Sequence, residues 1–351
     1  MTEENRPISA PKRVAVVRLS AAGDVVLTTP ALESLKAAWP ETEIIYVTKA
    51  LYHPLIKHHP AVSQVVPWGP EDSVGVVRSR LLELGVDALL DLHSSQRSRL
   101  LRWSLPGKPA VVWNKRPWLT NLTVRSGIRP YRPAITIAQR YHRAVEALVG
   151  RELPPGRLRF YGGPAESEEA ARVLREAGLD PERPLIGVSP GAKWNTKRWP
   201  AERFGEVIGR AQAAGFQCVI TGSPDETDLA EAIQAVAPEA VNLIGKVPFS
   251  LLGGIIERCT AFLANDSAPM HISRGLGVPT LAFFGSTAPE QFHFEGHALL
   301  FSNEPCAPCH FYGRKACPKK HFNCLMNISA DQAWLALQPL LDGERRGYLR
   351  G

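Results

Sequence analysis

The segment Arg13-Val-Ala-Val-Val-Arg-Leu19, followed at once by Ser20-Ala-Ala-Gly-Asp24, decides the fold. Its first part is rich in β-branched residues and has the length of a buried strand. Its second part combines small residues with an acid, which is typical of a turn leading into a helix. The residues from Val25 to Trp39 then predict that helix. Strand, turn and helix in this order indicate the opening unit of a parallel α/β sheet.

The same alternation of strands and helices continues along both halves of the chain. Alternation of this kind favours parallel sheets that helices cover on both faces. We therefore predict an α/β protein made of two Rossmann-like domains, whose parallel sheets face a central cleft. The further strands expected are Glu43–Thr48, Val62–Val66 and Ala88–Leu92 in the first half, and Leu185–Ser189, Cys218–Thr221, Ala261–Ala264 and Thr280–Phe284 in the second.

The segment from Leu153 to Pro164 is rich in proline and glycine, which predicts a linker between the two domains. We place an N-terminal, acceptor-binding domain at residues 1–155. A C-terminal, nucleotide-sugar-binding domain then covers residues 156–351, with its last helix free to pack back on the N-terminal domain. A fold of this kind is expected to close about a hinge in the linker.

The composition excludes several classes of protein. The 351 residues are 44% hydrophobic and 21% charged, so disorder or coiled coil does not describe the whole chain. No apolar run approaches the roughly 18 residues of a membrane-spanning helix. The first residues carry charges of both signs and two prolines, unlike a secretory signal. We therefore expect a cytoplasmic protein.

The common nucleotide-binding fingerprints are missing. A dinucleotide-dependent dehydrogenase would carry G-x-G-x-x-G after the first strand. The chain instead has Leu19-Ser-Ala-Ala-Gly-Asp24 there, and Ser189-Pro-Gly-Ala-Lys193 in the second half. It also lacks a Walker A loop. These observations argue against hydride transfer and against P-loop NTP hydrolysis.

Three loops at expected carboxyl ends of strands carry groups that could perform chemistry. Asp24 either caps the first helix or acts as a general base. Thr196 and Lys197 precede a helix expected from Pro200, where they either hold a phosphate or form a charged surface loop. In the loop from Asn265 to His271, the histidine contacts a ligand or packs within its helix.

Taken together, these loops resemble the family-nine glycosyltransferases, the ADP-heptose:lipopolysaccharide heptosyltransferases. The resemblance covers nearly the whole chain, and its motifs are specific as a set. They are Val-Arg-Leu-Ser-Ala-Ala-Gly-Asp-Val-Val-Leu-Thr-Thr-Pro-Ala-Leu (Val17 to Leu32), Asp91-Leu-His-Ser-Ser-Gln-Arg-Ser98, Gly191-Ala-Lys-Trp-Asn-Thr-Lys-Arg-Trp-Pro200, Thr221-Gly-Ser-Pro-Asp-Glu226 and Asn265-Asp-Ser-Ala-Pro-Met-His-Ile-Ser-Arg-Gly-Leu-Gly-Val-Pro-Thr280, which leads into Phe283-Phe-Gly285.

The resemblance implies a GT-B fold and an inverting transfer of heptose from ADP-heptose to an inner-core sugar of a lipid-anchored acceptor, without a catalytic metal or other cofactor. It implies that Asp24 is the general base for the acceptor hydroxyl. Lys197 would contact the diphosphate and stabilise the departing ADP. Ser189 and Thr196 would support that contact. The remaining residues implied are Glu226, Asp266, Ser267, Ala268 and His271 on the donor side, and Ser20, Gly23, Arg97 and Arg99 on the acceptor side.

The stretch from Leu92 to Val145 is basic throughout. It holds eleven basic residues and no acidic one, and Trp103, Trp113 and Trp118 lie among them. Such a stretch suits an anionic lipid surface, single-stranded nucleic acid or a solvated face. Given the resemblance, we expect it to meet an anionic acceptor and the inner face of the cytoplasmic membrane. The basic residues are Arg97, Arg99, Arg102, Lys108, Lys115, Arg116, Arg125, Arg129, Arg132, Arg140 and Arg143.

The six cysteines fall into two groups. Cys218 and Cys259 lie in apolar segments and are expected in the core. The other four follow the pattern C-x2-C-x7-C-x6-C, with His310 and His321 nearby. Cytosolic proteins rarely keep disulfides, so a structural zinc site and a set of packed, reduced thiols are the leading alternatives, ahead of a disulfide or redox role. The four cysteines are Cys306, Cys309, Cys317 and Cys324.

Two other functions remain open at this point. A GT-B enzyme could use a different nucleotide-sugar donor or glycolipid acceptor. A nucleic-acid-binding protein could use the basic stretch, with steeply salt-dependent affinity. The second reading leaves Asp24, Lys197 and the loop from Asp266 to His271 unexplained, so we expect no nucleic-acid partner.

Overall fold

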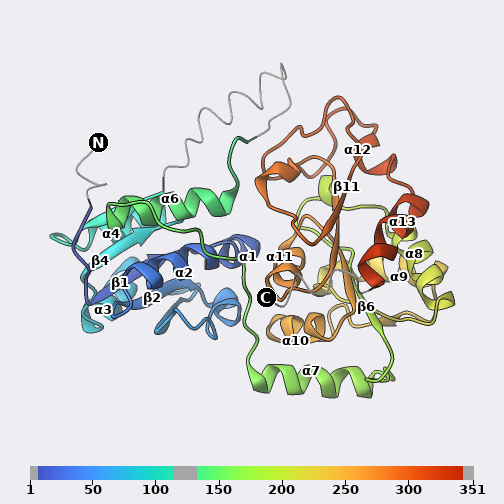
Figure 1. The fold of residues 1–351 in the computed structure, drawn as a ribbon, viewed down its shortest axis with the longest axis horizontal. Coiled ribbons are helices and arrows are strands. Elements are labelled where there is room, and N and C mark those ends of the chain that lie inside the picture. The colour runs from blue at the N-terminus through green and yellow to red at the C-terminus, as the bar shows by residue number, and fades with distance from the viewer. Residues whose placement is uncertain (1–6, 114–132, 343–351) are drawn as a thin grey trace. The chain divides into compact units, whose positions relative to one another are not determined.

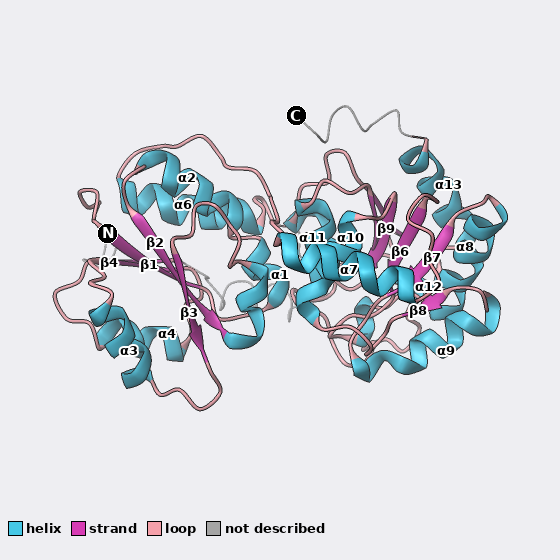
Figure 2. Cartoon of the chain, turned by 90° about the horizontal axis from the view of Figure 1, so that it is seen from below, coloured by secondary structure: helices cyan, strands magenta, loops and turns pink. Residues whose placement is uncertain are grey.

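The computed structural model describes residues 7–113 and 133–342. They fall into two compact units, the first within Met1–Arg116 and Ile135–Tyr161 and the second within Pro117–Ala134 and Gly162–Gly351. Each unit is built on one parallel sheet with helices on both of its faces (Figures 1 and 2). The predicted α/β class is therefore confirmed. Among the described helices, none has the length and apolar character that crossing a bilayer requires.

The sheet of the first unit consists of β1 (Arg13–Val17), β2 (Glu43–Lys49), β3 (Gln64–Trp68), β4 (Ala88–Asp91) and β5 (Ala110–Val112). Their order is β3-β2-β1-β4-β5, and all neighbours are parallel. The chain runs outward from β1 to β3 and then crosses to β4 on the other side of β1. Ligands of open α/β sheets bind at the carboxyl ends of strands at such a switch point.

The described helices of the first unit are α1 (Ala22–Val26), α2 (Thr29–Ala38), α3 (Val74–Glu83), α4 (Gln96–Trp103) and α6 (Ile137–Val149), with a 3₁₀ turn η2 (Ala50–Leu55). In Figure 2, α2 and α6 lie on one side of the sheet, and α3 and α4 lie on the other. Ala15 and Val17 pack with Leu81 and Leu101 on the α3–α4 side. Burial on both faces explains why β1 reads as a continuous apolar run.

The segment predicted as one helix from Val25 to Trp39 forms two helices, so that prediction is wrong. α1 ends at Val26 and α2 begins at Thr29. The cause is Pro30, which has no backbone N–H and cannot continue the hydrogen bonding of a preceding helix. It fits instead in the first turn of α2. The break leaves α1 as a short element that presents Asp24 at the end of β1.

The sheet of the second unit has the order β11-β10-β9-β6-β7-β8, and its neighbouring strands are parallel. Sequence analysis missed the two edge strands β8 and β11, because their burial is only partial. The strands are β6 (Leu185–Ser189), β7 (Gln217–Ile220), β8 (Val241–Asn242), β9 (Ala261–Asn265), β10 (Thr280–Phe284) and β11 (Ala298–Phe301).

Its described helices are α7 (Pro164–Glu176), α8 (Ala201–Ala213), α9 (Thr227–Val236), α10 (Leu252–Glu257), α11 (Ala268–Gly275), α12 (Asn323–Met326) and α13 (Ala330–Leu341). α8, α9 and α13 pack together, and α7, α10 and α11 form a second group. Trp199 stacks on Phe283 with ring centroids 4.1 Å apart. Leu337 of α13 lies in this same core, so α13 belongs to the second unit.

Candidate active site

Asp24 lies just after β1, at the switch point of the first sheet. Its Oδ2 is 2.6 Å from Nη2 of Arg18 and accepts a hydrogen bond from the backbone N–H of Ala21 at 3.1 Å. Its Oδ1 accepts a hydrogen bond from the Tyr141 hydroxyl at 3.1 Å. Burial alone would raise the pKa of this carboxyl group. The charge of Arg18 and these hydrogen bonds outweigh burial, so the pKa of Asp24 lies below its ordinary value.

Arg18 is the cation that holds Asp24 in place. Its side chain is only 4% exposed, and its Nη1 donates to the carbonyl oxygen of Leu92 at 2.7 Å. The guanidinium lies over the rings of Trp113 and Tyr141, 5.5 and 5.3 Å from their centroids. A buried cation needs a counter-charge, and Asp24 supplies it. The bond from Ala21 is also a capping contact, so Asp24 fulfils the structural expectation as well as offering an ionised carboxylate.

The carboxylate remains reachable. The Asp24 side chain is 22% exposed, while Ser20 and Gly23 beside it are also partly exposed. Burial raises the pKa of Tyr141 well above its ordinary value, so Tyr141 keeps its proton as a donor. An ionised, oriented and partly open carboxylate can accept a proton from a bound hydroxyl.

A polar pocket of about 290 Å³ lies beside α4, at the carboxyl ends of β4 and β5. Arg99 lines it, as does Arg102, whose Nη1 is 3.7 Å from Oδ2 of the buried Asp91. Of the two arginines proposed for the acceptor, Arg97 is not in this pocket. Its guanidinium lies over the Trp68 ring at 4.6 Å and donates to the backbone oxygen of Asp72 at 2.8 Å. The pocket lining is Asp91, Ser94, Ser95, Arg99, Arg102, Trp103 and Val112.

A larger pocket of about 430 Å³ lies along the edge strand β3. It contains the Arg80–Asp72 ion pair, with Nη1 and Oδ2 2.9 Å apart. None of the predicted site residues lines it. The smaller pocket beside α4, in contrast, is lined by Arg99, one of the predicted acceptor residues.

Part of the basic stretch can be placed. Trp103 is 62% exposed, but Trp113 is 6% exposed and packs edge-on against Tyr141. The expectation that Trp113 meets a membrane is therefore wrong, because its ring serves the Arg18 site. The predicted contacts of Lys115, Arg116, Trp118, Arg125, Arg129 and Arg132 lie outside the described residues.

In the second unit, the structure brings Lys197 and Asp266 together. Nζ of Lys197 lies 2.7 Å from Oδ2 of Asp266, and the same oxygen accepts a hydrogen bond from the Thr287 hydroxyl at 2.6 Å. Both charged side chains are largely buried, with 15% and 5% exposed. Burial would raise the pKa of Asp266, but the charge and hydrogen bond of Lys197 lower it below its ordinary value. The ion pair fixes a cation beside the N-terminus of α11.

Strand register explains why the loops that carry Lys197 and Asp266 meet. Ser189 at the end of β6 pairs with Ala264 of β9, so the following loops leave the same edge of the sheet. Asn265 connects the two loops. Its Oδ1 accepts a hydrogen bond from the backbone N–H of Trp199 at 3.0 Å, and its Nδ2 donates to the backbone oxygen of Pro190 at 2.6 Å. Asn265 is a positioning residue that the sequence-based assignment had not singled out.

Glu226 fits against the loop after β6 because position 191 is glycine. A Cβ on Gly191 would lie 1.9 Å from Oε1 of Glu226, so any other residue at position 191 would force the Glu226 carboxylate to move. Oε2 of Glu226 accepts a hydrogen bond from the Ser223 N–H at 2.9 Å. The carboxylate is thus held at the loop that also leads to Lys197.

The N-terminus of α11 carries the other predicted donor residues. Ser267 precedes the helix and donates to the Asn265 oxygen at 3.2 Å, and Ala268 is its first residue. His271 is 4% exposed and meets the Phe292 ring edge-on. Its Nδ1 is 3.5 Å from Nη1 of Arg274, a buried cation that sequence reasoning did not select. Burial lowers the pKa of Arg274 to about 10, while Asp266 opposes that shift.

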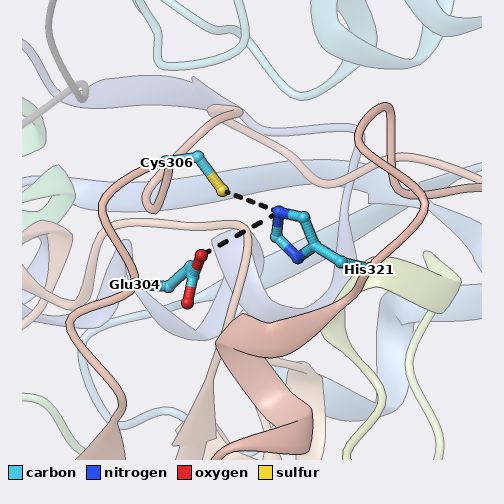
Figure 3. A group of neighbouring side chains, drawn as sticks. All are labelled: Glu304, Cys306 and His321. Carbon is cyan, nitrogen blue, oxygen red and sulfur yellow. Dashed lines mark hydrogen bonds and ion pairs between the residues drawn. The ribbon is translucent and has the colours of Figure 1, made fainter.

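All six cysteines are free thiols. Cys218 and Cys259 are buried, which confirms their place in the core. Among the described residues, Glu304, Cys306 and His321 are the group whose ligand atoms lie within 4.8 Å of one another (Figure 3). The other three clustered thiols lie outside that group, and Glu304 was not foreseen.

Over most of its length the chain is similar to known proteins. The family model described as Glycosyltransferase family 9 (heptosyltransferase) matches residues 75–321. Lipopolysaccharide heptosyltransferase 2 of Salmonella typhimurium is 26% identical over 306 residues, covering 79% of this chain and 84% of that protein.

Two solved structures share the fold. A family 9 glycosyl transferase from Veillonella parvula superposes with a TM-score of 0.77 at 24% identity, covering 95% of this chain and 98% of that one. The E. coli heptosyltransferase WaaC, solved with ADP-2-deoxy-2-fluoro heptose, gives a TM-score of 0.65 at 18% identity, covering 93% and 99%.

Proposed function

The chain belongs to glycosyltransferase family 9, and from this premise we propose that it transfers a heptose from ADP-heptose to an inner-core sugar of lipopolysaccharide. The observation that carries the proposal is the family match over residues 75–321, which spans the donor loops of the second unit. The donor is supported by the ADP-heptose analogue bound to WaaC. The acceptor is supported by the name of the Salmonella relative.

On the donor side, Lys197 would contact the diphosphate of ADP-heptose. Negative charge grows on the departing phosphate as the glycosidic bond breaks, and a fixed cation stabilises that growth. Asp266 keeps the ammonium group of Lys197 in position, but its own negative charge offsets part of that positive charge. The N-terminus of α11, beginning at Ala268, adds backbone N–H groups that favour an anion. Glu226 would accept hydrogen bonds from the ribose hydroxyls.

On the acceptor side, Asp24 would act as the general base. In a single displacement, the acceptor oxygen attacks C1 of the heptose, and the bond from C1 to the phosphate oxygen breaks. The bonding electrons leave with ADP, and the hydroxyl proton passes to the carboxylate of Asp24. One displacement at C1 inverts its configuration. The low pKa of Asp24 keeps the base ionised, so proton transfer accompanies formation of the new C–O bond.

The polar pocket beside α4 would hold an anionic group of the acceptor. Arg99 and Arg102 provide positive charge there, and Ser94 and Ser95 provide hydroxyl groups. The inner core of a lipid-anchored acceptor carries carboxylates and phosphates, which suit such a lining. We also propose that the basic stretch keeps the enzyme at the inner face of the cytoplasmic membrane.

Donor binding tests this function most simply. The expected result is that ADP raises the melting temperature of the full chain, while equal UDP, GDP and NAD do not. Lys197→Ala should lose the effect of ADP. Lys193→Ala is the matched control, because Lys193 is an exposed cation of the same loop, 5.6 Å from the Trp194 ring. Preference for UDP or GDP would contradict the donor assignment but leave the GT-B fold untouched.

A further inference from the structure

The helix α4 carries an apolar stripe on the side that faces solvent. Leu101, and Leu105 just after the helix, are buried in the core of the first unit. Leu100 and Trp103, in contrast, are 50% and 62% exposed. Residues three apart on a helix lie on the same face, so these two apolar side chains are neighbours. The helix therefore has a second apolar side that the core does not use.

The exposed ring on this side is a tryptophan. Among the described residues, Trp103 is the tryptophan with most of its surface exposed, and the others are buried or half-buried. Single exposed apolar residues are common on protein surfaces. A tryptophan beside a leucine makes a larger apolar surface, and such surfaces mark sites where a partner binds. The indole ring favours the boundary between lipid and water, because its apolar body enters the lipid while its N–H stays hydrated.

The charges around this stripe are positive. Gln96 and Arg99 are the other exposed residues of α4, and they continue the stripe at spacings of three and four residues. The guanidinium of Arg99 lies 6.0 Å from the centre of the Trp103 ring, and no carboxylate of the described residues pairs with it. From residue 92 to residue 113 the chain has four basic residues and no acidic one. This charge complements an anionic lipid surface.

The structure separates two parts of the basic stretch. The helix α4 lies on one side of the sheet together with α3, and α6 lies on the other side (Figure 2). A flat membrane cannot lie against both sides of one sheet. The exposed residues of α6 are polar, Gln139 and Arg143, whereas α4 exposes a leucine and a tryptophan. Of the two helices, α4 is therefore the one suited to a lipid surface.

We propose that Arg99, Leu100 and Trp103 of α4 dock the first unit on an anionic phospholipid surface. The leucine and the tryptophan enter the headgroup boundary, and Arg99 pairs with lipid phosphates. Arg99 and Trp103 also line the polar pocket beside α4. That pocket then opens at the membrane surface, where the sugar of a lipid-anchored acceptor lies. This last step rests on the proposed sugar transfer, whereas the docking itself does not.

Vesicle binding of the full chain at low salt tests the surface. Vesicles of equal parts phosphatidylglycerol and phosphatidylcholine should bind it about tenfold more tightly than phosphatidylcholine alone. Arg99→Gln and Leu100→Ser should each weaken binding about fivefold, and Trp103→Ala about tenfold. The matched controls are Leu335→Ser on α13, a leucine that is 65% exposed, and Arg143→Gln on α6. Unchanged binding in the three α4 variants, or an equal loss in the controls, would overturn the proposal.

The position of the tryptophan has its own readout. Phosphatidylglycerol with brominated acyl chains should quench part of the tryptophan fluorescence, and Trp103→Phe should lose most of that quenching. Quenching that persists in Trp103→Phe would overturn insertion of this ring. If Leu100→Ser converts a dimer into a monomer and leaves vesicle binding unchanged, the stripe binds a second copy of the chain instead. If Trp103→Ala raises only the KM for a soluble acceptor, the ring stacks on the acceptor sugar instead.

Activity separates docking from sugar transfer. On a water-soluble acceptor without its lipid, Leu100→Ser should keep the kcat and the acceptor KM of the unmodified chain, because Leu100 does not line the pocket. On an acceptor embedded in anionic vesicles, the same variant should transfer about fivefold more slowly. Equal rates on vesicles would overturn docking as a step toward the acceptor. No transfer by the unmodified chain to either acceptor, with vesicle binding as expected, would contradict the proposed function and leave the docking surface in place.

Discussion

Arg18 and Asp24 form a largely buried ion pair, in which Nη2 of the arginine lies 2.6 Å from Oδ2 of the aspartate. The arginine is the less exposed partner, at 4% against 22%. The pair does two things at once. It gives the buried guanidinium of Arg18 a counter-charge, and it keeps the partly exposed carboxylate of Asp24 ionised at the carboxyl end of β1.

Replacing Asp24 should affect catalysis and stability together. Asp24→Asn removes the proton acceptor, so kcat should fall about 10²- to 10⁴-fold. It also leaves the guanidinium of Arg18 buried without a counter-charge, which should cost about 3 kcal/mol of unfolding free energy in urea. Asp331→Asn is the matched control, because Asp331 is 76% exposed and pairs with Arg210 at the surface. A stable but inactive Asp24→Asn would contradict the structural half of this prediction.

Activity should depend on pH through Asp24. Because its pKa lies below the ordinary value, the base stays ionised until the pH falls beneath the usual carboxyl range. Tyr141→Phe removes the hydrogen bond to Oδ1 and should raise that pKa, so the acidic limb of kcat/KM moves to higher pH. The stability that the ion pair contributes is present above the ordinary carboxyl pKa and is lost as the pH falls through the native value. An acidic limb that does not move in Tyr141→Phe would argue against Asp24 as the base.

Lys197 should matter more for the transition state and for bound ADP, whose terminal phosphate carries the extra negative charge, than for binding of ADP-heptose. Lys197→Ala should lower kcat about 10²- to 10³-fold with ADP-heptose, because the charge on the leaving ADP is then unopposed. Lys197→Ala also leaves Asp266 buried without its cation. Lys197→Arg serves as a second variant, because it keeps a positive charge beside Asp266. Steady-state kinetics of both variants beside Lys193→Ala give the comparison. An equal loss of kcat in Lys193→Ala would mean that the effect comes from the overall positive charge of the loop and not from Lys197 itself.

Adding one methyl group at Gly191 should displace Glu226. The new Cβ would overlap Oε1 of Glu226, so Gly191→Ala should raise the KM for the donor about tenfold, the effect of one charged hydrogen bond. Gly209→Ala is the control, because a Cβ there meets nothing within 4 Å and lies in α8. An unchanged donor KM in Gly191→Ala would contradict a hydrogen bond between Glu226 and the ribose.

Arg99 should act on the acceptor and not on the donor. Arg99→Gln should raise the acceptor KM by up to about fivefold at low salt, and by less at high salt, because the charge is solvent-accessible. Arg143→Gln on α6, an exposed arginine of the same basic stretch, is the control. A matching rise in donor KM would count against an acceptor pocket beside α4.

Much of this site could be predicted from local sequence. The loops after β1, β6 and β9 were recognised because strand ends, small residues and charges fall together within a few positions. The Lys197–Asp266 contact then follows from the pairing of β6 with β9. Arg18 also left a signal, since it interrupts an apolar run, and a buried cation requires a partner.

The partners contributed by distant segments could not be predicted in this way. Tyr141 reaches Asp24 from α6, and no local pattern links a tyrosine there to a turn after β1. Arg97 and Arg99 look equivalent in the sequence. Residues two apart on a helix point to different faces, however, and only Arg99 lines the pocket. The sequence alone gives no sign that Trp113 is buried. Its contact with Arg18 arises only because the sheet brings these two distant segments together.

Heptose transfer is tested most directly by mass spectrometry of an inner-core acceptor incubated with ADP-heptose and the full chain. The acceptor should gain one heptose, ADP should appear in equal amount, and nuclear magnetic resonance should show the inverted anomeric configuration. Asp24→Asn should give almost no product, whereas Asp331→Asn should match the unmodified chain. Transfer from another nucleotide sugar but not from ADP-heptose, or retention of configuration, would contradict inverting transfer of heptose.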